Sequence, residues 1–541
     1  MEESPKSFVL IDVNAESWTG LLDRAGVVAV ALLIAGYVFI IGRSSYFWLG
    51  DYPNHLARAT VMADLMFHHG SHFGADFQYQ FMFVPYVLAD VALTGLIELL
   101  GPGPAASVWE CVTFLSYPCA VLFFLRVNRT PTTGQIIGVL FATVLSPDWF
   151  FFAGWCAFRL GLALMLVAVG LAIMLRRRRS GALACLYAVV VVSAYLMHVS
   201  ALLFTVAAIG ITGLLRLWHR ETNLRTEALL WVPILALVAW KFGFVNEGRL
   251  TQNTLQGNGL FEWQWGSFRE KLSFATYEFH RFGLPVETVL NAGFLVCLGL
   301  AGFLAVRRRG SIRGWLLDPA VRDCLALSMT FFGMYFILPH QFPDAAFVDI
   351  RAIAPAVTFL VAATLCGSAT GDVNHRHLAV GAMLATTVLS IATLAVLREH
   401  LDSQDTWISN YRRIVAAVPG GSRVWDVTRQ LGPFAMASSS ILIDRNAVIP
   451  SLYSGDNGNP MLYFRYLRRP YVPQKRWWQF RGEANQPSPV VDWKRVGCDY
   501  DFILAEQPWD RRWLGVETST IAENSSAMLL RLSKSSCQHP E

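Results

Sequence analysis

Three side chains able to do chemistry together follow the first long apolar run of the chain. The segment Gly50–Arg58 (GDYPNHLAR) contains an acid, Asp51, an imidazole, His55, and a guanidinium, Arg58. A proline in a first helical turn favours a helix from about Pro53, which places Arg58 one turn on, His55 beside it and Asp51 just before the start. A carboxylate beside an apolar segment can act as a general base towards a hydroxyl, tuned by the nearby His and Arg. Asp51 could equally cap the helix, and the local sequence favours neither role.

Other ionisable side chains stand where apolar runs end, and they are candidates for holding a phosphate, which needs cationic or N–H donors. With His55 and Arg58, these candidates are Arg159, His198, His340 and Arg351. His198 is the most suggestive because it lies in a tight turn between two apolar runs, where an ionisable residue is costly unless it faces a cavity. Plainer roles stay open: a satisfied turn histidine for His198, and snorkelling arginines for Arg159 and Arg351.

A second histidine group predicts no metal site. His68 and His72 have the i, i+4 spacing that can bind a metal on a helix, but Gly70 lies between them and no third ligand follows at a fixed spacing. We therefore interpret this group as the polar end of a helix.

The elements that must position these residues are membrane helices. The chain is 54% hydrophobic and only 15% charged, whereas a soluble domain carries about 25% charged residues. This composition excludes an ordinary soluble enzyme, argues against a nucleic-acid partner and makes membrane lipids the surroundings. The formal charge of +5, from 44 basic and 39 acidic residues, matters less than the loops in which the arginines lie.

Twelve apolar runs are candidates for crossing the membrane. They lie near 25–39, 84–100, 105–125, 135–153, 158–175, 182–197, 199–217, 228–245, 286–306, 321–338, 353–370 and 378–397. Short cytoplasmic loops retain arginine. The arginine clusters are Arg126/Arg129, Arg176–Arg179, Arg216/Arg220/Arg225, Arg307–Arg309 with Arg313, and Arg376. Placing these clusters inside makes the loops at 147–158, 198, 246–285 and 339–352 external.

One early run must then stay out of the membrane if the N-terminal segment 1–24 is also cytoplasmic. The best candidate is 84–100, which carries Asp90 and Glu98 and is followed by a Gly-Pro-Gly-Pro segment, so we expect it to lie along the external interface. This leaves about eleven transmembrane helices in a domain spanning 25–398, with a first external loop at about 46–104. If 84–100 crosses instead, the N-terminus is external and Asp51 internal.

The last part of the chain, 399–541, is polar and has no further run that could span, which predicts a soluble extracytoplasmic domain. Short apolar stretches at 422–427, 439–449 and 500–507 resemble strands of a small α/β unit. This domain would be periplasmic in a Gram-negative cell, with the spans in the inner membrane, and Cys498 could pair there with Cys537. The other seven of the nine cysteines lie in apolar stretches, where they are expected to pack.

An acid in the first external loop, directly after the first span and followed by juxtamembrane helices, resembles the GT-C class of bacterial membrane glycosyltransferases. The resemblance is sharp only over Gly50–Arg58 and loose over the rest of the multi-span body. It implies an inverting transfer of a sugar from a polyprenyl-phosphate-linked donor to a lipid, glycan or protein acceptor, with Asp51 as the base. Many members have a second acid next to the first, where this chain has Tyr52, so a role for a divalent cation stays open and His55 could replace that acid. No other cofactor is implied.

Two further functions compete with this enzyme: a lipid or solute transporter or flippase, and a non-catalytic envelope assembly protein. Against a transporter, charged residues are scarce within the spans, whereas ion-coupled carriers bury an acid near the midplane. The aromatic patches Trp149–Phe152 and Trp477–Trp478 favour an interfacial belt over a sugar platform. The long external loop 246–285 could close over a bound lipid.

Overall fold

The computed structural model describes residues 15–44, 49–240, 264–274, 285–308, 311–342, 345–366, 373–427, 436–452, 461–465, 470–471, 491–507 and 516–534. The predictions for Trp477–Trp478, for Cys537 and for most of the loop 246–285 lie outside these residues. In the described parts of the chain, long helices form the body and a small sheet lies near the C-terminus.

The apolar runs predicted from the sequence fold as helices. The long helices of the bundle are α1 (Ala15–Arg43), α4 (Pro102–Val127), α5 (Thr132–Leu145), α7 (Cys156–Arg177), α8 (Gly181–Met197), α9 (Val199–Trp218), α10 (Leu224–Trp240), α13 (Pro285–Arg308), α15 (Pro319–Ile337), α16 (Ile353–Cys366) and α17 (Val373–Ala416). Six helices among the described residues are long and apolar enough to cross a membrane, and four shorter apolar helices accompany them. An α-helical membrane fold is confirmed, while the number of about eleven spans stays a prediction.

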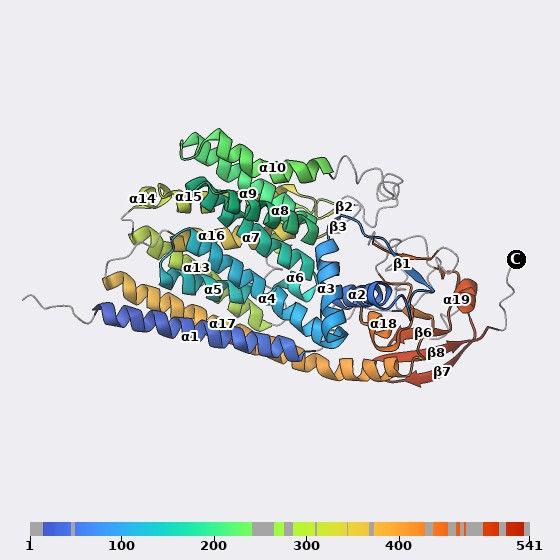
Figure 1. Cartoon of the computed structure of the whole chain (residues 1–541). Helices are drawn as coiled ribbons and strands as arrows, with labels where there is room; N and C mark the ends of the chain where they lie inside the picture. The colour runs from blue at the N-terminus through green and yellow to red at the C-terminus, as the bar shows by residue number, and fades with distance from the viewer. Residues whose placement is uncertain are drawn as a thin grey trace, which may run out of the picture.

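Two helices of the loop that follows α1 run across the end of this bundle (Figure 1). They are α2 (Tyr52–Phe67), with its proline in the first turn as predicted, and α3 (Val87–Leu100). α3 has 14 residues, about 21 Å at 1.5 Å per residue, which is shorter than the roughly 30 Å of a hydrocarbon core. Its position and length are those expected of the interfacial helix predicted at 84–100.

The predicted external segments lie together at one end of the bundle (Figure 1). Besides α2 and α3, this end holds the short helix α6 (Trp149–Phe152), the two-stranded hairpin of β2 (Gln341–Phe342) and β3 (Ala345–Ala346), and the 3-10 turn η4 (Ile350–Ala352). Helix α14 (Ile312–Leu316) and the start of α1 lie at the opposite end. The alternation that was derived from the arginine clusters therefore matches the arrangement of the helices.

The arginine run that was read as a topological signal also makes structural contacts. Arg176 donates to both carboxylate oxygens of Glu227 at 2.8 Å and to Thr212 Oγ1 at 3.0 Å, which ties α7 to α9 and α10. Arg216 pairs in the same way with Asp323 of α15, at 2.7 Å. Buried charges require such partners, so these ion pairs fix the arginine-rich end of the bundle.

The C-terminal part forms a four-stranded sheet with the order β4-β6-β8-β7. The strands are β4 (Val424–Val427), β6 (Phe502–Glu506), β7 (Thr518–Glu523) and β8 (Ala527–Leu532), with β4 and β6 parallel and the other pairs antiparallel. The strand predictions at 422–427 and 500–507 are confirmed. The strand predicted at 439–449 is wrong, because its centre forms helix α18 (Ser440–Arg445); a short apolar run does not distinguish a buried helix from a strand.

Helix α17 continues through the predicted domain boundary at 398/399 and ends at Ala416. Near the end of the sheet domain, Cys498 of helix α19 (Trp493–Asp499) is disulfide-bonded, while its predicted partner Cys537 lies outside the described residues.

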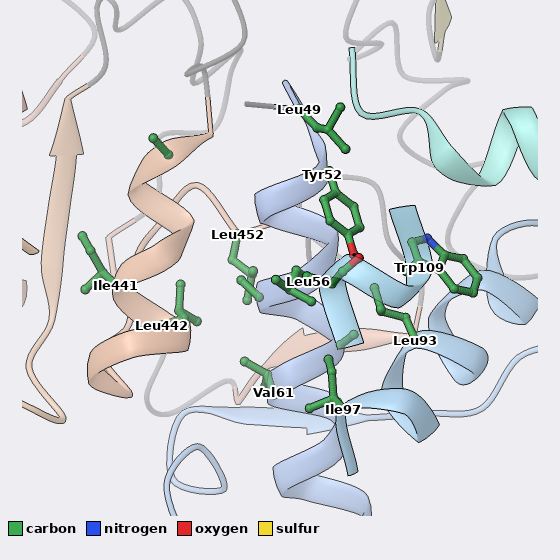
Figure 2. Close-up of a cluster of buried hydrophobic side chains, with 14 of the residues drawn as sticks. Leu49, Tyr52, Leu56, Val61, Leu93, Ile97, Trp109, Ile441, Leu442 and Leu452 are labelled. Carbon is green, nitrogen blue, oxygen red and sulfur yellow. The ribbon is translucent and has the colours of Figure 1, made fainter. Parts of the chain in front are cut away.

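The sheet domain shares one hydrophobic core with the first external loop (Figure 2). Leu56 and Val61 of α2 lie between Leu93 of α3 and the side chains of Ile441 and Leu442 of α18. A strand of the loop, β1 (Phe77–Tyr79), also pairs with β5 (Leu462–Phe464) of the C-terminal part. The helix that follows Asp51 is therefore held on one side by the membrane bundle and on the other by the C-terminal domain.

Candidate active site

The backbone before α2 is pinned against the turn between α6 and α7. The N–H of Gly50 donates to Phe152 O and that of Asp51 donates to Ala153 O, both at 2.9 Å. Gly154, at φ +80°, completes this turn, and a Cβ there would lie 2.4 Å from the Tyr52 nitrogen. Only glycine allows both this left-handed conformation and this approach, so the turn fixes the place where Asp51 stands.

The side chain of Asp51 does not cap α2. Its backbone occupies the N-cap position, but the carboxylate makes no capping hydrogen bond. Oδ2 instead accepts a hydrogen bond from Nε1 of Trp155, at 2.8 Å. Of the two roles that the sequence left open, the structure thus rejects the cap and turns the carboxylate towards the residue that precedes α7.

Next to Asp51, a buried ion pair joins α2 to α3. Arg58 donates to Asp90 and lies 3.0 Å from Nδ1 of His55, and the side chains of Arg58 and Asp90 are almost fully buried. Burial, with the Arg58 charge adding to it, holds the pKa of His55 well below its usual value. His55 is therefore neutral near pH 7, and the charge of Arg58 is balanced by Asp90.

Arg351 brings η4 to the same place. Its guanidinium carbon lies 4.6 Å from the centre of the Trp155 ring and 5.6 Å from that of Phe158. Its Nη1 lies 3.2 Å from Ser200 Oγ and 3.3 Å from Nε2 of His198. Trp155 is thus in contact with both the Asp51 carboxylate and the Arg351 guanidinium.

The protonation of His198 follows from its hydrogen bonds. The backbone N–H of Ser200 donates to Nδ1 at 3.0 Å, so that nitrogen carries no proton. In the neutral ring the proton is on Nε2, which lies 2.9 Å from the hydroxyl of Tyr86. Burial, together with the Arg351 charge and His55, holds the pKa of His198 well below its usual value, so the ring stays neutral. His198 is consequently an N–H donor and not a cation.

Tyr86, the residue before α3, lies among all these groups. It stands at φ +74°, a left-handed conformation that is uncommon for a non-glycine residue, and such strain clusters at functional sites. Burial raises the pKa of the Tyr86 phenol above its usual value; the charges of Arg351 and Arg58 lower it to a smaller extent, and those of Asp51 and Asp90 add to the rise. If Nε2–H of His198 donates to the Tyr86 oxygen, the phenolic proton points elsewhere.

Two of the predicted phosphate-binding residues are engaged away from this group. Arg159 is 1% exposed, donates to Asp148 at 2.5 Å and to Ser146 O at 3.1 Å, and lies over the ring of Tyr117. It therefore fastens the turn before α7. Its side chain is buried and does not reach solvent, as the snorkelling alternative would require.

His340 does not belong to the group around Asp51 and supports it through Asp349. Its Nδ1 lies 3.0 Å from Oδ1 of Asp349, a carboxylate that also accepts from the backbone N–H of Ile350 at the start of η4. Lys271, from helix α12 (Phe268–Phe274) between α10 and α13, lies 3.4 Å from the other oxygen of Asp349. These contacts hold the turn that carries Arg351.

In the parts of the chain that the structure describes, no three or more His, Cys, Asp or Glu side chains gather as metal ligands. α2 ends at Phe67 and Gly70 adopts a left-handed conformation, so His68 and His72 do not share a helical face. His68 instead lies 3.0 Å from Glu98 of α3. A divalent cation at Asp51 stays a prediction.

The structure therefore brings together five of the candidate residues, Asp51, His55, Arg58, His198 and Arg351, and adds Tyr86 and Trp155, which the sequence did not indicate. The sequence around Tyr86 contains no pattern that marks it as a site residue, apart from the preceding Pro85. Its left-handed backbone conformation is imposed by tertiary packing, which the local sequence does not reveal. Trp155 follows Gly154, and this glycine before an apolar run was the available signal for a tight turn.

The fold is similar to that of ArnT, which confirms the GT-C-like fold expected from the Gly50–Arg58 segment. Two of the similar solved structures are crystal structures of ArnT from Cupriavidus metallidurans, one bound to undecaprenyl phosphate and one in the apo state. They are 12% and 13% identical to this chain, cover 96% of it and 99% of their own length, and have a TM-score of 0.54. At this identity the likeness is one of fold. No protein-family profile and no curated protein matches the sequence.

Proposed function

We propose that the protein is a glycosyltransferase that moves a sugar from a polyprenyl-phosphate-linked donor to an acceptor hydroxyl, with inversion at the anomeric carbon. One observation carries the proposal: Trp155 holds a carboxylate at its indole nitrogen and a guanidinium over its ring. The Asp51 carboxylate, a possible base, and the Arg351 guanidinium, a possible phosphate ligand, therefore contact the same side chain. The ArnT-like fold and the undecaprenyl phosphate bound to one ArnT structure support this choice of donor class.

The reaction needs one proton acceptor and one stabilised leaving group. Asp51 removes the proton of the acceptor hydroxyl as its oxygen attacks the anomeric carbon of the sugar. The bond between that carbon and the phosphate oxygen breaks, and the bonding electron pair leaves with the polyprenyl phosphate. Because attack and departure occur on opposite faces of the carbon, the configuration inverts.

The leaving phosphate would be received by a group of converging donors. Arg351 supplies the charge, His198 supplies Nε2–H, and the Tyr86 phenol supplies O–H, within reach of each other. Two donors that face each other at 3.3 Å, Arg351 Nη1 and His198 Nε2, do not satisfy one another, and an anion between them would accept from both. His55, neutral beside Arg58, would help to place Asp51.

We propose further that this end of the bundle faces outside, in a bacterial inner membrane with residues 399–541 periplasmic. A cysteine at the exposed Gln78, and a second variant with a cysteine at the exposed Arg178, test this in a protein free of reactive native thiols. A membrane-impermeant thiol reagent should label the first in intact cells and the second only after lysis. The reverse pattern would place Asp51 inside.

The reaction class is tested with the purified protein and a panel of sugars linked to polyprenyl phosphate or to nucleotides, measuring release of the carrier. We expect release from a polyprenyl-phosphate donor with the wild type and none with Asp51→Asn, and weaker activity in His55→Ala and His198→Ala. Turnover of nucleotide sugars alone, or of no donor in the panel, would contradict the proposal.

A transporter is the second candidate, because one observation favours it. Glu110 of α4 is 1% exposed, and neither carboxylate oxygen has a hydrogen-bond partner among the described residues. Ion-coupled carriers bury such an acid. Glu110→Gln separates the two: a carrier loses coupled transport, whereas a glycosyltransferase based on Asp51 retains sugar transfer.

A further inference from the structure

We infer that Trp155 is a positioning residue that sets the orientation of the Asp51 base and the place of the Arg351 guanidinium at the same time. The inference rests on the proposed function and goes beyond it, because it assigns a role to a residue that neither binds substrate nor transfers the proton.

The indole ring is itself held in place. The Trp155 backbone N–H donates to Phe150 O at 3.0 Å, and Gly154 before it adopts the left-handed conformation that closes the turn. Around the ring, the centre of Trp149 lies 5.6 Å away, that of Phe150 5.2 Å and that of Phe347 6.0 Å. Aromatic contacts of this kind fix the plane of a ring, so its edge and its face point in defined directions.

The edge and the face of the Trp155 ring make different interactions. The indole N–H holds Oδ2 of Asp51, and a hydrogen bond to a carboxylate favours the ionised form that a base requires. The ring face attracts the Arg351 guanidinium, and this contact replaces part of the water that the cation loses on burial. In an in-line displacement the base and the leaving-group site must stand on opposite sides of the reacting carbon, so their spacing governs the rate.

The other charged and titratable groups around Asp51 must stay unchanged in any test. They are His55 and Arg58 on α2, Tyr86 just before α3, Asp90 on α3 and Arg351 on η4. Replacing Trp155 by phenylalanine leaves all of these residues in the chain. It removes the indole N–H and keeps an aromatic face for the guanidinium.

The experiment is the pH dependence of kcat/KM for transfer by Trp155→Phe, together with its dissociation constant for undecaprenyl phosphate. Loss of a hydrogen bond to the ionised carboxylate should move the acidic limb of the profile up by about one pH unit. We expect kcat to fall about tenfold at neutral pH. The dissociation constant should stay within about twofold, because the ring face remains. Trp155→Leu, which removes the edge and the face, should also weaken lipid binding by about fivefold or more.

The matched control is Trp149→Phe, in the same aromatic cluster. Trp149 contacts the rings of Trp155 and Phe347, and phenylalanine keeps an aromatic ring at that place while the Trp155 N–H remains, so the variant should keep the acidic limb of the wild type. A Trp155→Phe profile that superimposes on the wild type overturns the inference, and so does an equal shift in Trp149→Phe. Failure of the proposed function is a different result, since Asp51→Asn would then transfer sugar as the wild type does.

Discussion

Replacing Arg351 by glutamine should weaken the binding of undecaprenyl phosphate by about 30- to 150-fold. Arg351 contacts the Trp155 ring, Ser200 and His198, whereas Arg58 and Arg159 form ion pairs with Asp90 and Asp148. A hydrogen bond to a charged group is worth about 1.5–3 kcal/mol. A guanidinium that binds a phosphate through one or two such bonds therefore contributes about 2–3 kcal/mol, and every 1.4 kcal/mol is a factor of ten in affinity.

The assay is a titration of the purified protein with undecaprenyl phosphate in detergent or nanodiscs, followed by native mass spectrometry. Arg351→Lys keeps a charge but loses the planar contact with Trp155, so we expect an intermediate loss of about five- to tenfold. Arg178→Gln, at the opposite end of α7, is the control and should bind as the wild type does. An Arg351→Gln affinity within threefold of wild type, with an unchanged unfolding temperature, would refute the assignment of Arg351 to the phosphate.

Two further predictions concern how the site is held. Gly154→Ala should lower the unfolding temperature and reduce transfer by at least about tenfold. A left-handed alanine costs about 1–2 kcal/mol, and its Cβ would displace the start of α2. The control Gly103→Ala, with no atom within 4 Å of its Cβ, should change neither quantity. The pH dependence of stability should follow the titration of His198, whose pKa is lower in the folded than in the unfolded chain. The stabilisation is fully present above about pH 6.5. As the pH falls below this value, the free energy of unfolding decreases by up to about 1.4 kcal/mol per pH unit. Unfolding temperatures at pH 7.5 and 5.5 should therefore differ more in the wild type than in His198→Gln, and equal differences would count against the buried neutral imidazole.

The helices of the body could be predicted because a long apolar run has few alternatives in a membrane. The run at 158–175 became α7 (Cys156–Arg177) and the run at 199–217 became α9 (Val199–Trp218). The arginine clusters, in turn, predicted which loops share an end of the bundle. The strand predicted at 439–449 was wrong because packing against α2 and α17, and not a local period, decides the conformation of so short a segment.

The partners of the charged residues could not be predicted. Asp51 and Trp155 are 104 residues apart in the chain, and the Arg58–Asp90 and His198–Arg351 contacts also join distant segments. Sequence analysis could name residues of suitable chemistry at suitable ends of helices. It could not tell that Arg159 is neutralised by Asp148, or that His340 supports η4 through Asp349, because ion pairing and burial are set by the tertiary structure.

The most direct test of the account is to measure undecaprenyl phosphate binding and sugar transfer for Asp51→Asn in one preparation. The substitution is nearly isosteric and can keep a hydrogen bond from Trp155, so only the proton acceptor is lost. We expect a dissociation constant within about twofold of wild type and a transfer rate reduced by about 10³-fold or more. Transfer at a rate near that of the wild type would contradict the assignment of Asp51 as the base, and with it the proposed mechanism.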